Sequence, residues 1–424
     1  MLNYRDMESD KVKSTFKYAF GPGLILAAAA IGVSHLVQST RAGADYGFTL
    51  IWAVILASLM KYPFLEYGPR YAAVTQESLI AGYKKLGGWA LWIYIIFTVG
   101  TMFAIQAAVT IVTASLAVEL TGIEVPLLVW SIIILAICIG ILFRGQYSAL
   151  DSIIKLVMVV LTISTVTAFV VALLKGHSPS LTEAPSVWDA AGVTFLIALM
   201  GWMPIPIDAA AWHSLWTLER EKQTSHRSSM KESLLDFNIG YIGSAMLALV
   251  FLGLGALVMF GSGVNFSSAG AAFAQQLIDL YTQTLGDWAH WIIIICAFTT
   301  MFSTTLTVTD SYPRVSREIF RVIGVDKNSN SWIFSYKGLL FVISAISMLV
   351  LYITGSQFAY IIDLATSLSF LTAPALAFIN YRLIMSRFFP EEYRPKLWLR
   401  LLSWFGMIFL SAFALLFFYW RFFV

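Results

Sequence analysis

Charged residues are scarce in this chain. Only 12% of its 424 residues are Asp, Glu, Lys or Arg, about half the share found in soluble domains, whereas 59% are hydrophobic. This composition excludes a nucleic-acid binder, a disordered scaffold and a secreted disulfide protein, and it predicts an integral membrane protein. The two cysteines, Cys138 and Cys296, lie inside apolar runs. We interpret them as small buried side chains and not as a redox pair or a metal site.

The sequence also lacks several nucleotide-binding and catalytic motifs. The sequence contains no Walker-type phosphate loop, no nucleophile elbow and no zincin motif, so we expect neither ATP hydrolysis nor another enzymatic activity, and no cofactor. A channel is disfavoured because no filter-like repeat is present. A membrane enzyme or receptor-like sensor has no catalytic constellation to support it. The class that remains is a secondary transporter.

Apolar runs long enough to cross a bilayer recur along the whole chain. They are too long and too uniformly apolar for barrel strands, so we predict helices. The eleven predicted spans cover residues 19–39, 47–65, 89–118, 126–143, 150–174, 191–212, 235–260, 288–311, 337–354, 358–381 and 398–420.

The basic residues fix an expected orientation. With the N-terminus inside, 24 of the 27 Lys and Arg residues fall on inner segments, and only Arg41, Lys175 and Arg421 fall outside. Positive charge accumulates on the cytoplasmic side of membrane proteins, so we predict a cytoplasmic N-terminus and an outer C-terminus, most simply in a bacterial inner membrane. The alternative for the first span is a signal peptide, since Lys11–Lys17 precedes an apolar run.

Two of the predicted spans contain helix-breaking residues. The first includes Gly32-Val33-Ser34-His35, and the sixth reads Gly201-Trp202-Met203-Pro204-Ile205-Pro206-Ile207-Asp208. Prolines remove backbone donors, and lipid tolerates such a break only where it is buried in protein or lines a cavity. The two spans open successive groups of five. Paired breaks of this kind indicate an inverted-repeat transporter whose site lies at the breaks.

Polar groups at the breaks are the candidates for cargo binding. His35 can ligate a cation as neutral imidazole or carry a proton, and the alternative is a hydrogen bond to a neighbouring carbonyl. Asp208 can hold cargo, an ion or a proton, or it can cap the second half-helix. The predicted substrate-binding residues are Gly32, Ser34, His35, Met203, Ile205 and Asp208, of which His35 and Asp208 are the predicted metal ligands.

The eighth span is rich in hydroxyl side chains over residues 299–310. Such hydroxyls usually bond the carbonyl one turn earlier in their own helix, but a pair of them can complete an oxygen cage for a hard cation. We therefore predict Thr304 and Thr305 as ligands of a coupling ion. Asp310 is expected to form a local ion pair with Arg314.

Other polar residues have simpler or open interpretations. Arg41 and Asp45 are spaced for an ion pair or gate at the outer end of the first span. Asp363 belongs either to the pathway or to an outer vestibule, and Gln106 is expected to be structural. The outer stretch without Lys or Arg predicts an amphipathic surface helix around Ala271–Leu285.

At these residues the chain resembles the NRAMP family of proton-coupled divalent-metal transporters. Gly21-Pro22 opens the first span as in that family, and Ala42-Gly43-Ala44 followed by Tyr46-Gly47 matches the outer end. The sixth-span Gly201 to Pro206, followed by His213-Ser214, is similar with a short offset. The resemblance implies an all-α integral membrane protein of eleven transmembrane helices. Its fold would be the leucine-transporter-like inverted repeat of five plus five helices with one extra helix, working by alternating access.

The same resemblance implies a division of the chain. Its parts are a cytoplasmic N-terminal segment (1–18), a first five-helix repeat (19–174), an outer loop (175–190), a second inverted repeat (191–383), and an inner loop with the eleventh helix (384–424).

The departures from the family fall on its metal site. Its first-span Asp-Pro-Gly-Asn is here Gly32-Val33-Ser34-His35, so glycine replaces the metal-binding aspartate and histidine replaces the asparagine. Its sixth-span Met-Pro-His is here Ile205-Pro206-Ile207, unless Met203-Pro204 is the matching pair. Span three carries no acid before Glu119, and span nine no arginine after Lys337. The family's usual proton path is therefore not recognisable.

The residues and the resemblance together leave two classes of transported substrate possible. One is a divalent metal of the Mn, Fe or Mg class, held by His35 and Asp208 with freed carbonyls. The other is a small organic solute such as an amino acid, driven by sodium or protons, with its anionic group at a half-helix N-terminus and sodium at Thr304 and Thr305. The lipid bilayer is the other expected partner. Oligomeric state, coupling ion and direction of transport stay open.

Overall fold

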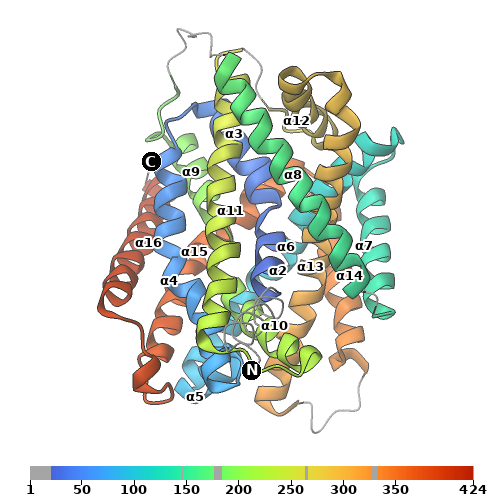
Figure 1. The fold of residues 1–424 in the computed structure, drawn as a ribbon. Coiled ribbons are helices and arrows are strands. Elements are labelled where there is room, and N and C mark those ends of the chain that lie inside the picture. Colours follow the sequence, from blue (N-terminus) through green and yellow to red (C-terminus); the bar gives the residue numbers. More distant parts are fainter. Residues whose placement is uncertain (1–20, 146, 176–183, 263–265, 326–331, 424) are drawn as a thin grey trace, which may run out of the picture.

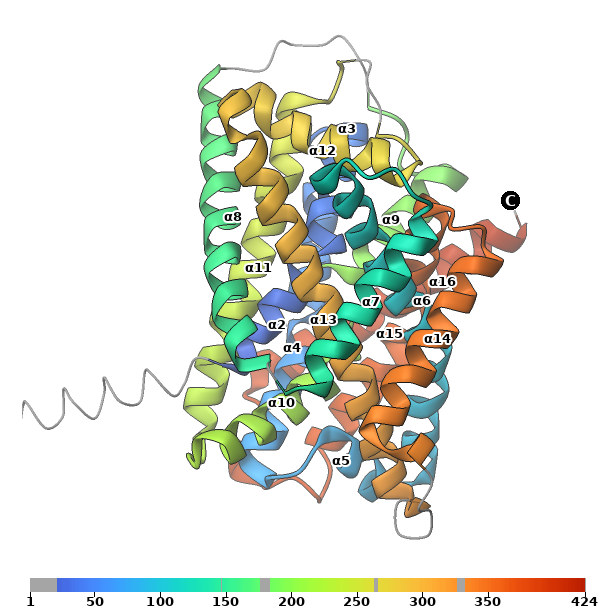
Figure 2. The same ribbon diagram turned by 90° about the vertical axis from the view of Figure 1, so that its right-hand side faces the viewer.

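The computed structural model describes residues 21–145, 147–175, 184–262, 266–325 and 332–423, and throughout these ranges the regular elements are helices. The predicted segment 1–18 and residues 176–183 of the predicted outer loop lie outside the described residues. The long helices run side by side along one axis, as Figures 1 and 2 show from two directions. Helices α3 and α12 lie at one end of the bundle, and α5 and α10 lie at the other.

The first half of the chain forms the elements α2 (Pro22–Ala30), η1 (Val33–Ser39), α3 (Thr40–Tyr46), α4 (Ile51–Thr75), α5 (Leu79–Leu86), α6 (Gly88–Thr121), α7 (Leu127–Phe143) and α8 (Tyr147–Lys175). The second half forms α9 (Ala190–Trp202), α10 (Ala209–Thr224), α11 (Met230–Val258), α12 (Gly270–Leu285), η2 (Asp287–Ala289), α13 (His290–Ile323), η4 (Trp332–Phe334), α14 (Tyr336–Ile353), α15 (Phe358–Ile384), η5 (Glu391–Tyr393) and α16 (Leu397–Phe423).

Each predicted span coincides with one long helix or with a broken pair. Among the described residues, seven helical segments are long and apolar enough to cross a membrane, and α7, the apolar part of α8 and α9 are shorter apolar helices. Helix α4 is outside both groups and carries Lys61, Glu66 and Arg70. The count of eleven spans therefore stays a prediction. The predicted amphipathic helix is confirmed as α12, which buries one face including Phe273 and Leu277.

Polar caps begin helices where the apolar runs meet polar sequence. Asp189 accepts a hydrogen bond from the Gly192 amide at the start of α9, and Ser229 and Glu232 form a capping box at the start of α11. Ser335 caps α14 by accepting a hydrogen bond from the Gly338 amide. These side chains satisfy amide groups that have no partner inside the helix, so they set where each helix starts.

Each broken helix packs against the second helix of the other half of the chain. Helix α4 packs on α10, and α11 packs on α2 and α3, while α15 packs on α9. The second helix of each half thus covers the broken helix of the other half. An inverted repeat would produce this exchange, which buries both breaks at the centre of the bundle.

Small residues allow these helices to approach closely. A Cβ atom on Gly43 would lie 1.9 Å from the carbonyl oxygen of Leu252 in α11, and one on Gly255 would lie 2.3 Å from that of Thr40. In α4, a Cβ on Gly68 would lie 2.3 Å from the carbonyl oxygen of Ala210. Close backbone approach at small residues is a main source of helix association in membranes.

We expect Gly43→Val to destabilise the protein, because the added side chain must push α3 away from α11. Overpacking of this kind costs about 1–3 kcal/mol or more, which lowers the thermal unfolding temperature in detergent. Gly100→Ala is the matched control, since a Cβ at Gly100 meets no atom within 4 Å. Equal unfolding temperatures for the two variants would contradict the packing described here.

Candidate functional site

The two predicted breaks are confirmed at the centre of the bundle. Helix α2 ends at Ala30, and η1, a π-helix, begins at Val33 after Ile31 and Gly32. Helix α9 ends at Trp202, and α10 begins at Ala209. Pro204 and Pro206 lie between the two and have no amide hydrogen to donate. Ser34 and His35, which we expected inside the first break, instead lie in the first turn of η1.

Gly21-Pro22 does not interrupt the first span but starts it. Pro22 occupies the first turn of α2, where proline fits without loss of a hydrogen bond. The amides of Gly21 and Gly23 donate to the two carboxylate oxygens of Asp236 in α11, at 3.1 and 2.5 Å. Sequence reasoning did not single out Asp236. A buried acid at a helix N-terminus stabilises the helix dipole, so Asp236 holds the start of α2.

A small cavity separates the two breaks. Its volume is about 20 Å³, which is room for one water molecule or one ion of similar size. Ser34, Ile205 and Thr304 line it among the predicted site residues. The remaining lining residues are Ala29, Ala30, Val33, Ile105, Val109, Trp202, Pro204, Pro206, Trp212 and Val308. None of these side chains carries a charge.

Ser34 connects the two breaks through its hydroxyl group. Its Oγ lies 2.6 Å from the carbonyl oxygen of Ala30, 3.3 Å from that of Pro204 and 2.7 Å from Nδ1 of His35. A hydroxyl has one hydrogen to donate, so these acceptors compete for it. Ser34 is therefore an adaptable polar group that faces the second break.

His35 is directed toward α11. Its Nε2 donates to the carbonyl oxygen of Ser244 at 2.8 Å, and its ring packs edge-on against Phe251. With Nε2 protonated, the neutral ring leaves Nδ1 to accept from Ser34. This is the hydrogen bond to a neighbouring carbonyl that the sequence left as an alternative. A metal ion can reach His35 only if one of these two partners is released.

Of three further predicted substrate-binding residues, one lines the cavity and two lie near it. Met203 is buried, and its sulfur accepts a hydrogen bond from Ser39 at 3.8 Å. Gly32 faces α13, since a Cβ atom there would lie 2.7 Å from the Thr304 hydroxyl. Ile205 is buried and supplies an apolar wall.

Asp208 is buried at the start of α10. Tyr312 of α13 donates to its Oδ2 at 3.3 Å, and its Oδ1 has no hydrogen bond of good geometry, although the amides of Asp208 and Ala209 interact with the carboxylate. Asp208 occupies the N-cap position but makes no capping hydrogen bond. A buried carboxylate oxygen without a donor is costly. A bound cation or proton would therefore stabilise Asp208 more than any other group at the breaks.

The two predicted coupling-ion ligands point in different directions. Thr304 donates toward the carbonyl oxygen of Ala28 in α2 at 3.0 Å, whereas Thr305 lies 3.1 Å from the Val109 carbonyl and 2.7 Å from the Thr113 hydroxyl in α6. Only Thr304 reaches the first break. The structure therefore does not bring Thr304 and Thr305 into one cage, and the coupling role stays a prediction.

Lys61 is buried inside the protein, which the distribution of basic residues along the sequence did not predict. The sequence count placed it on the inner side, yet its side chain is fully buried. Its ammonium group donates to the carbonyl oxygens of Met200 and Gly201 at 2.6 and 2.7 Å. Lys61 and Asp208 interact electrostatically, although the described residues show no ion pair between them within 4.0 Å.

A polar cluster lies at the end of the bundle near α3. Arg41 pairs with Asp363 of α15 at 3.1 Å, and Gln38 bonds to both of them. The guanidinium group of Arg41 also lies over the Phe195 ring of α9, 5.1 Å from its centre. The ion pair of Arg41 is with Asp363 and not with Asp45, which interacts with Arg41 only electrostatically, because the packing of α15 beside the first span brings Asp363 within reach. The Arg41 cluster joins the first, sixth and tenth spans.

We expect Arg41→Ala to loosen this end of the protein. Loss of a partly exposed ion pair is worth up to about 1 kcal/mol, so reaction of a Ser39→Cys thiol with an impermeant methanethiosulfonate should accelerate about threefold. Ser39 is buried behind the cluster, and Cys138 is a buried free thiol. Ser39→Cys with Arg41 intact gives the reference rate. An unchanged rate would mean that the cluster does not act as a gate.

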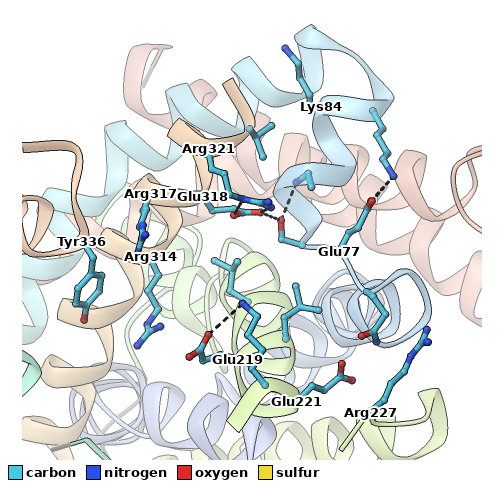
Figure 3. Close-up of a pocket in the computed structure, with 18 of the residues that line it drawn as sticks. Glu77, Lys84, Glu219, Glu221, Arg227, Arg314, Arg317, Glu318, Arg321 and Tyr336 are labelled. Atoms are coloured by element: carbon cyan, nitrogen blue, oxygen red, sulfur yellow. Dashed lines mark hydrogen bonds and ion pairs between the residues drawn. The ribbon is translucent and has the colours of Figure 1, made fainter. Parts of the chain in front are cut away.

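A large cavity opens at the other end, which the basic residues predict to be cytoplasmic. Its volume is about 1190 Å³, and its walls come from α5, α10, α13, their flanking segments and the first residue of α14. Arg314, Arg317 and Tyr336 lie on one side of it and Glu77 and Lys84 on the other (Figure 3). We call this cavity the inner vestibule. The inner vestibule and the Arg41 cluster therefore lie at opposite ends of the bundle.

The inner vestibule is positively charged. Seven Lys and Arg side chains line it against four Glu side chains. Three of the acids are neutralised in ion pairs, Glu77 with Lys85, Glu219 with Lys222, and Glu318 with Arg321. The expected local pair of Asp310 with Arg314 is confirmed at 2.6 Å.

Gln106 bridges α6 and α13. Its amide nitrogen donates to Thr309 of α13 and to Thr110, each at 3.1 Å.

Within the described part of the chain, no three His, Cys, Asp or Glu side chains come together to hold a metal ion.

These features define a class of fold, the helical secondary transporter with two broken helices. A manganese transporter of Eremococcus coleocola, in a mutant form, superimposes with a TM-score of 0.69 at 15% identity, covering 95% of this chain and 86% of that one. MhsT in complex with L-phenylalanine superimposes with a TM-score of 0.64 at 15% identity, covering 94% and 98%. Both structures share the leucine-transporter-like architecture with this chain.

The sequence comparison places the chain more narrowly. The family model described as natural resistance-associated macrophage protein-like matches residues 23–420. Uncharacterized protein PM0681 of Pasteurella multocida (strain Pm70) is 36% identical over 98% of this chain and 96% of its own length. The divalent metal cation transporter MntH of Levilactobacillus brevis is 25% identical over 57% of this chain and 54% of its own length. The chain belongs to the NRAMP family and is an integral membrane transporter.

Proposed function

We propose that this chain is a secondary transporter that moves a divalent metal cation by alternating access. Its cargo would pass between the breaks at Gly32 and at 203–208. The observation that carries the proposal is the cavity between these breaks, whose volume of about 20 Å³ in this conformation accommodates one ion. The metal named for the MntH relative and for the Eremococcus structure agrees with this size.

The proposed ligands are mainly oxygen atoms. Asp208 would supply the carboxylate after turning toward the cavity, which it does not line in this structure. The Ser34 hydroxyl and the Pro204 carbonyl lie together beside the cavity. His35 joins this set only after it releases Ser34 or Ser244. Oxygen ligands with a single imidazole suit Mn and Mg better than softer metals. We therefore place the cargo in the Mn, Fe or Mg class.

The membrane setting is part of the same proposal. The basic inner vestibule and the distribution of Lys and Arg favour a cytoplasmic N-terminus, an outer C-terminus and a bacterial inner membrane. Helix α2 begins at the end of the bundle where α5 and α10 lie, and α16 ends toward the α3 end (Figure 1).

Manganese uptake into proteoliposomes tests the proposal. Vesicles carrying the protein and loaded with a metal-sensitive dye should respond to external manganese faster than empty vesicles do. His35→Ala and Asp208→Ala then show which ligands are used. Folded protein that gives no uptake of manganese, iron or magnesium above the empty vesicles would refute metal transport.

A second candidate, transport of a small organic acid, is favoured by two charges. Lys61 already places a cation at the carbonyl end of α9, and the inner vestibule carries an excess of positive charge. Both features attract an anion and repel a metal ion. A thermal-shift screen of amino acids and other carboxylates, with and without sodium, separates this candidate from the first. Stabilisation by a carboxylate but by no metal would select it.

A further inference from the structure

Lys61 forms an unusual contact at the end of α9. Its side chain lies on α4, is 0% exposed, and donates through Nζ to the carbonyl oxygens of Met200 and Gly201 at 2.6 and 2.7 Å. Across the described residues, no acidic side chain lies within 4.0 Å of this ammonium group. Its direct partners are therefore the two carbonyl groups of the half-helix.

The carbonyl end of α9 is suited to a cation. The last carbonyl groups of a helix have no amide partner within it, and they form the negative end of the helix dipole. Here Pro204 and Pro206 follow immediately and supply no amide hydrogen. The Met203 amide makes only a long contact of 3.4 Å with the Met200 carbonyl oxygen. In broken-helix transporters such carbonyl ends coordinate dissolved cations.

The ammonium group of Lys61 occupies the carbonyl end of α9. The ammonium group of a lysine and a sodium or ammonium ion that has shed its water can satisfy the same carbonyl oxygens with the same charge. The ammonium of Lys61 is delivered from a separate helix, so it stays at the break when the surrounding solution changes. The longer-range electrostatic interaction with Asp208 balances part of its charge across the same break.

We propose that Lys61 is a tethered cation that occupies a monovalent-cation site at the carbonyl end of α9. No dissolved ion then binds at this break, and the protein needs no sodium or potassium there. This inference goes beyond the proposed function, because it holds for a metal cargo and for an organic one. It is also distinct from a coupling ion at Thr304, which lies beside the other broken helix.

Chemical rescue of Lys61→Ala tests the proposal. Removal of the side chain leaves two buried carbonyl groups and a space that a small cation can enter. In choline chloride we expect the unfolding temperature of Lys61→Ala in detergent to fall by about 3 °C or more below wild type. Ammonium, methylammonium or sodium chloride should restore at least half of that fall, while wild type shows no difference among the four salts.

Two variants serve as controls. Lys61→Met keeps an unbranched stem that fills the space, so it should be destabilised without rescue by any cation. Lys175 donates in a similar way to the last carbonyl groups of α12, Gln283 and Thr284, but at an exposed position. Lys175→Ala should therefore show neither the large fall nor the salt effect, because water can solvate those carbonyl groups.

The outcomes are distinct. Selective stabilisation of Lys61→Ala by small cations supports the tethered cation, and equal behaviour of Lys61→Ala and wild type in all four salts overturns it. A destabilised Lys61→Ala that no cation rescues also overturns it, since Lys61 would then act only through packing. If Lys61→Ala gives no folded protein, the same series is run on Lys61→Ser. None of these readouts depends on transport, so failure of the proposed metal cargo leaves the test intact.

Discussion

Asp208→Asn is expected to lower the initial rate of manganese uptake into proteoliposomes about tenfold or more. Asp208 is the acidic residue within the two break segments, and one of its oxygens has no hydrogen bond of good geometry. Removing the charge from a buried cation ligand costs several kcal/mol, and about 1.4 kcal/mol already corresponds to a factor of ten. Asparagine keeps the size of the side chain, so the loss reports charge and not packing.

Two variants make this result specific. Asp208→Glu retains the charge and should keep a larger part of the rate than Asp208→Asn does. Asp279→Asn removes a carboxylate from α12, away from the breaks, and should transport like wild type. If Asp208→Asn keeps more than half of the wild-type rate, the carboxylate is not a cargo ligand and the metal proposal loses its main residue.

Asp236→Ala is expected to be the most destabilising change at the start of the first span. Its carboxylate receives the amides of both Gly21 and Gly23 and is buried. Loss of a helix cap costs about 1–2 kcal/mol, and each buried amide left unpaired adds about 1–3 kcal/mol. We therefore expect a fall of the unfolding temperature larger than that of any surface variant, measured by thermal unfolding in detergent.

A surface cap provides the comparison for Asp236. Glu232 lies in the same helix and completes an exposed capping box with Ser229. Water can replace its hydrogen bond, so Glu232→Ala should lower the unfolding temperature much less. Similar effects of Asp236→Ala and Glu232→Ala would show that the link from α11 to α2 is not important for stability.

The breaks were predictable because their cause is local. Gly32 and the prolines of the sixth span interrupt the helix wherever the chain places them, so the sequence alone located both breaks. The amphipathic helix α12 was predictable for the same reason, since its apolar face follows from periodicity within the segment. Membrane composition and the family resemblance then led to the transporter fold.

The partners of the site residues were not predictable in the same way. His35 bonds to Ser244, which is 209 positions away, and Arg41 pairs with Asp363, which is 322 positions away. Local spacing favoured Asp45 for Arg41, and tertiary packing decided otherwise. Thr304 and Thr305 are adjacent in sequence, yet the helical turn directs them toward different helices.

Lys61 shows a limit of counting charges. The orientation rule treats each basic residue as part of an inner or outer segment, and Lys61 lies close enough to the inner end of the predicted second span to be counted inside. Its burial depends on two carbonyl groups that become available only because α9 ends at Trp202. The signal in the sequence was a lysine placed inside a predicted membrane span, where a charge needs a partner.

Alternating access to the cavity between the breaks is the central claim, and side-resolved labelling of Ile205→Cys tests it most directly. Ile205 lines that cavity. We predict that an impermeant thiol reagent reacts from the inner vestibule side in otherwise wild-type protein, that Arg41→Ala adds reaction from the α3 side, and that manganese slows both. A thiol that reacts equally from both sides in wild type, or from neither side in any variant, would contradict alternating access at this cavity.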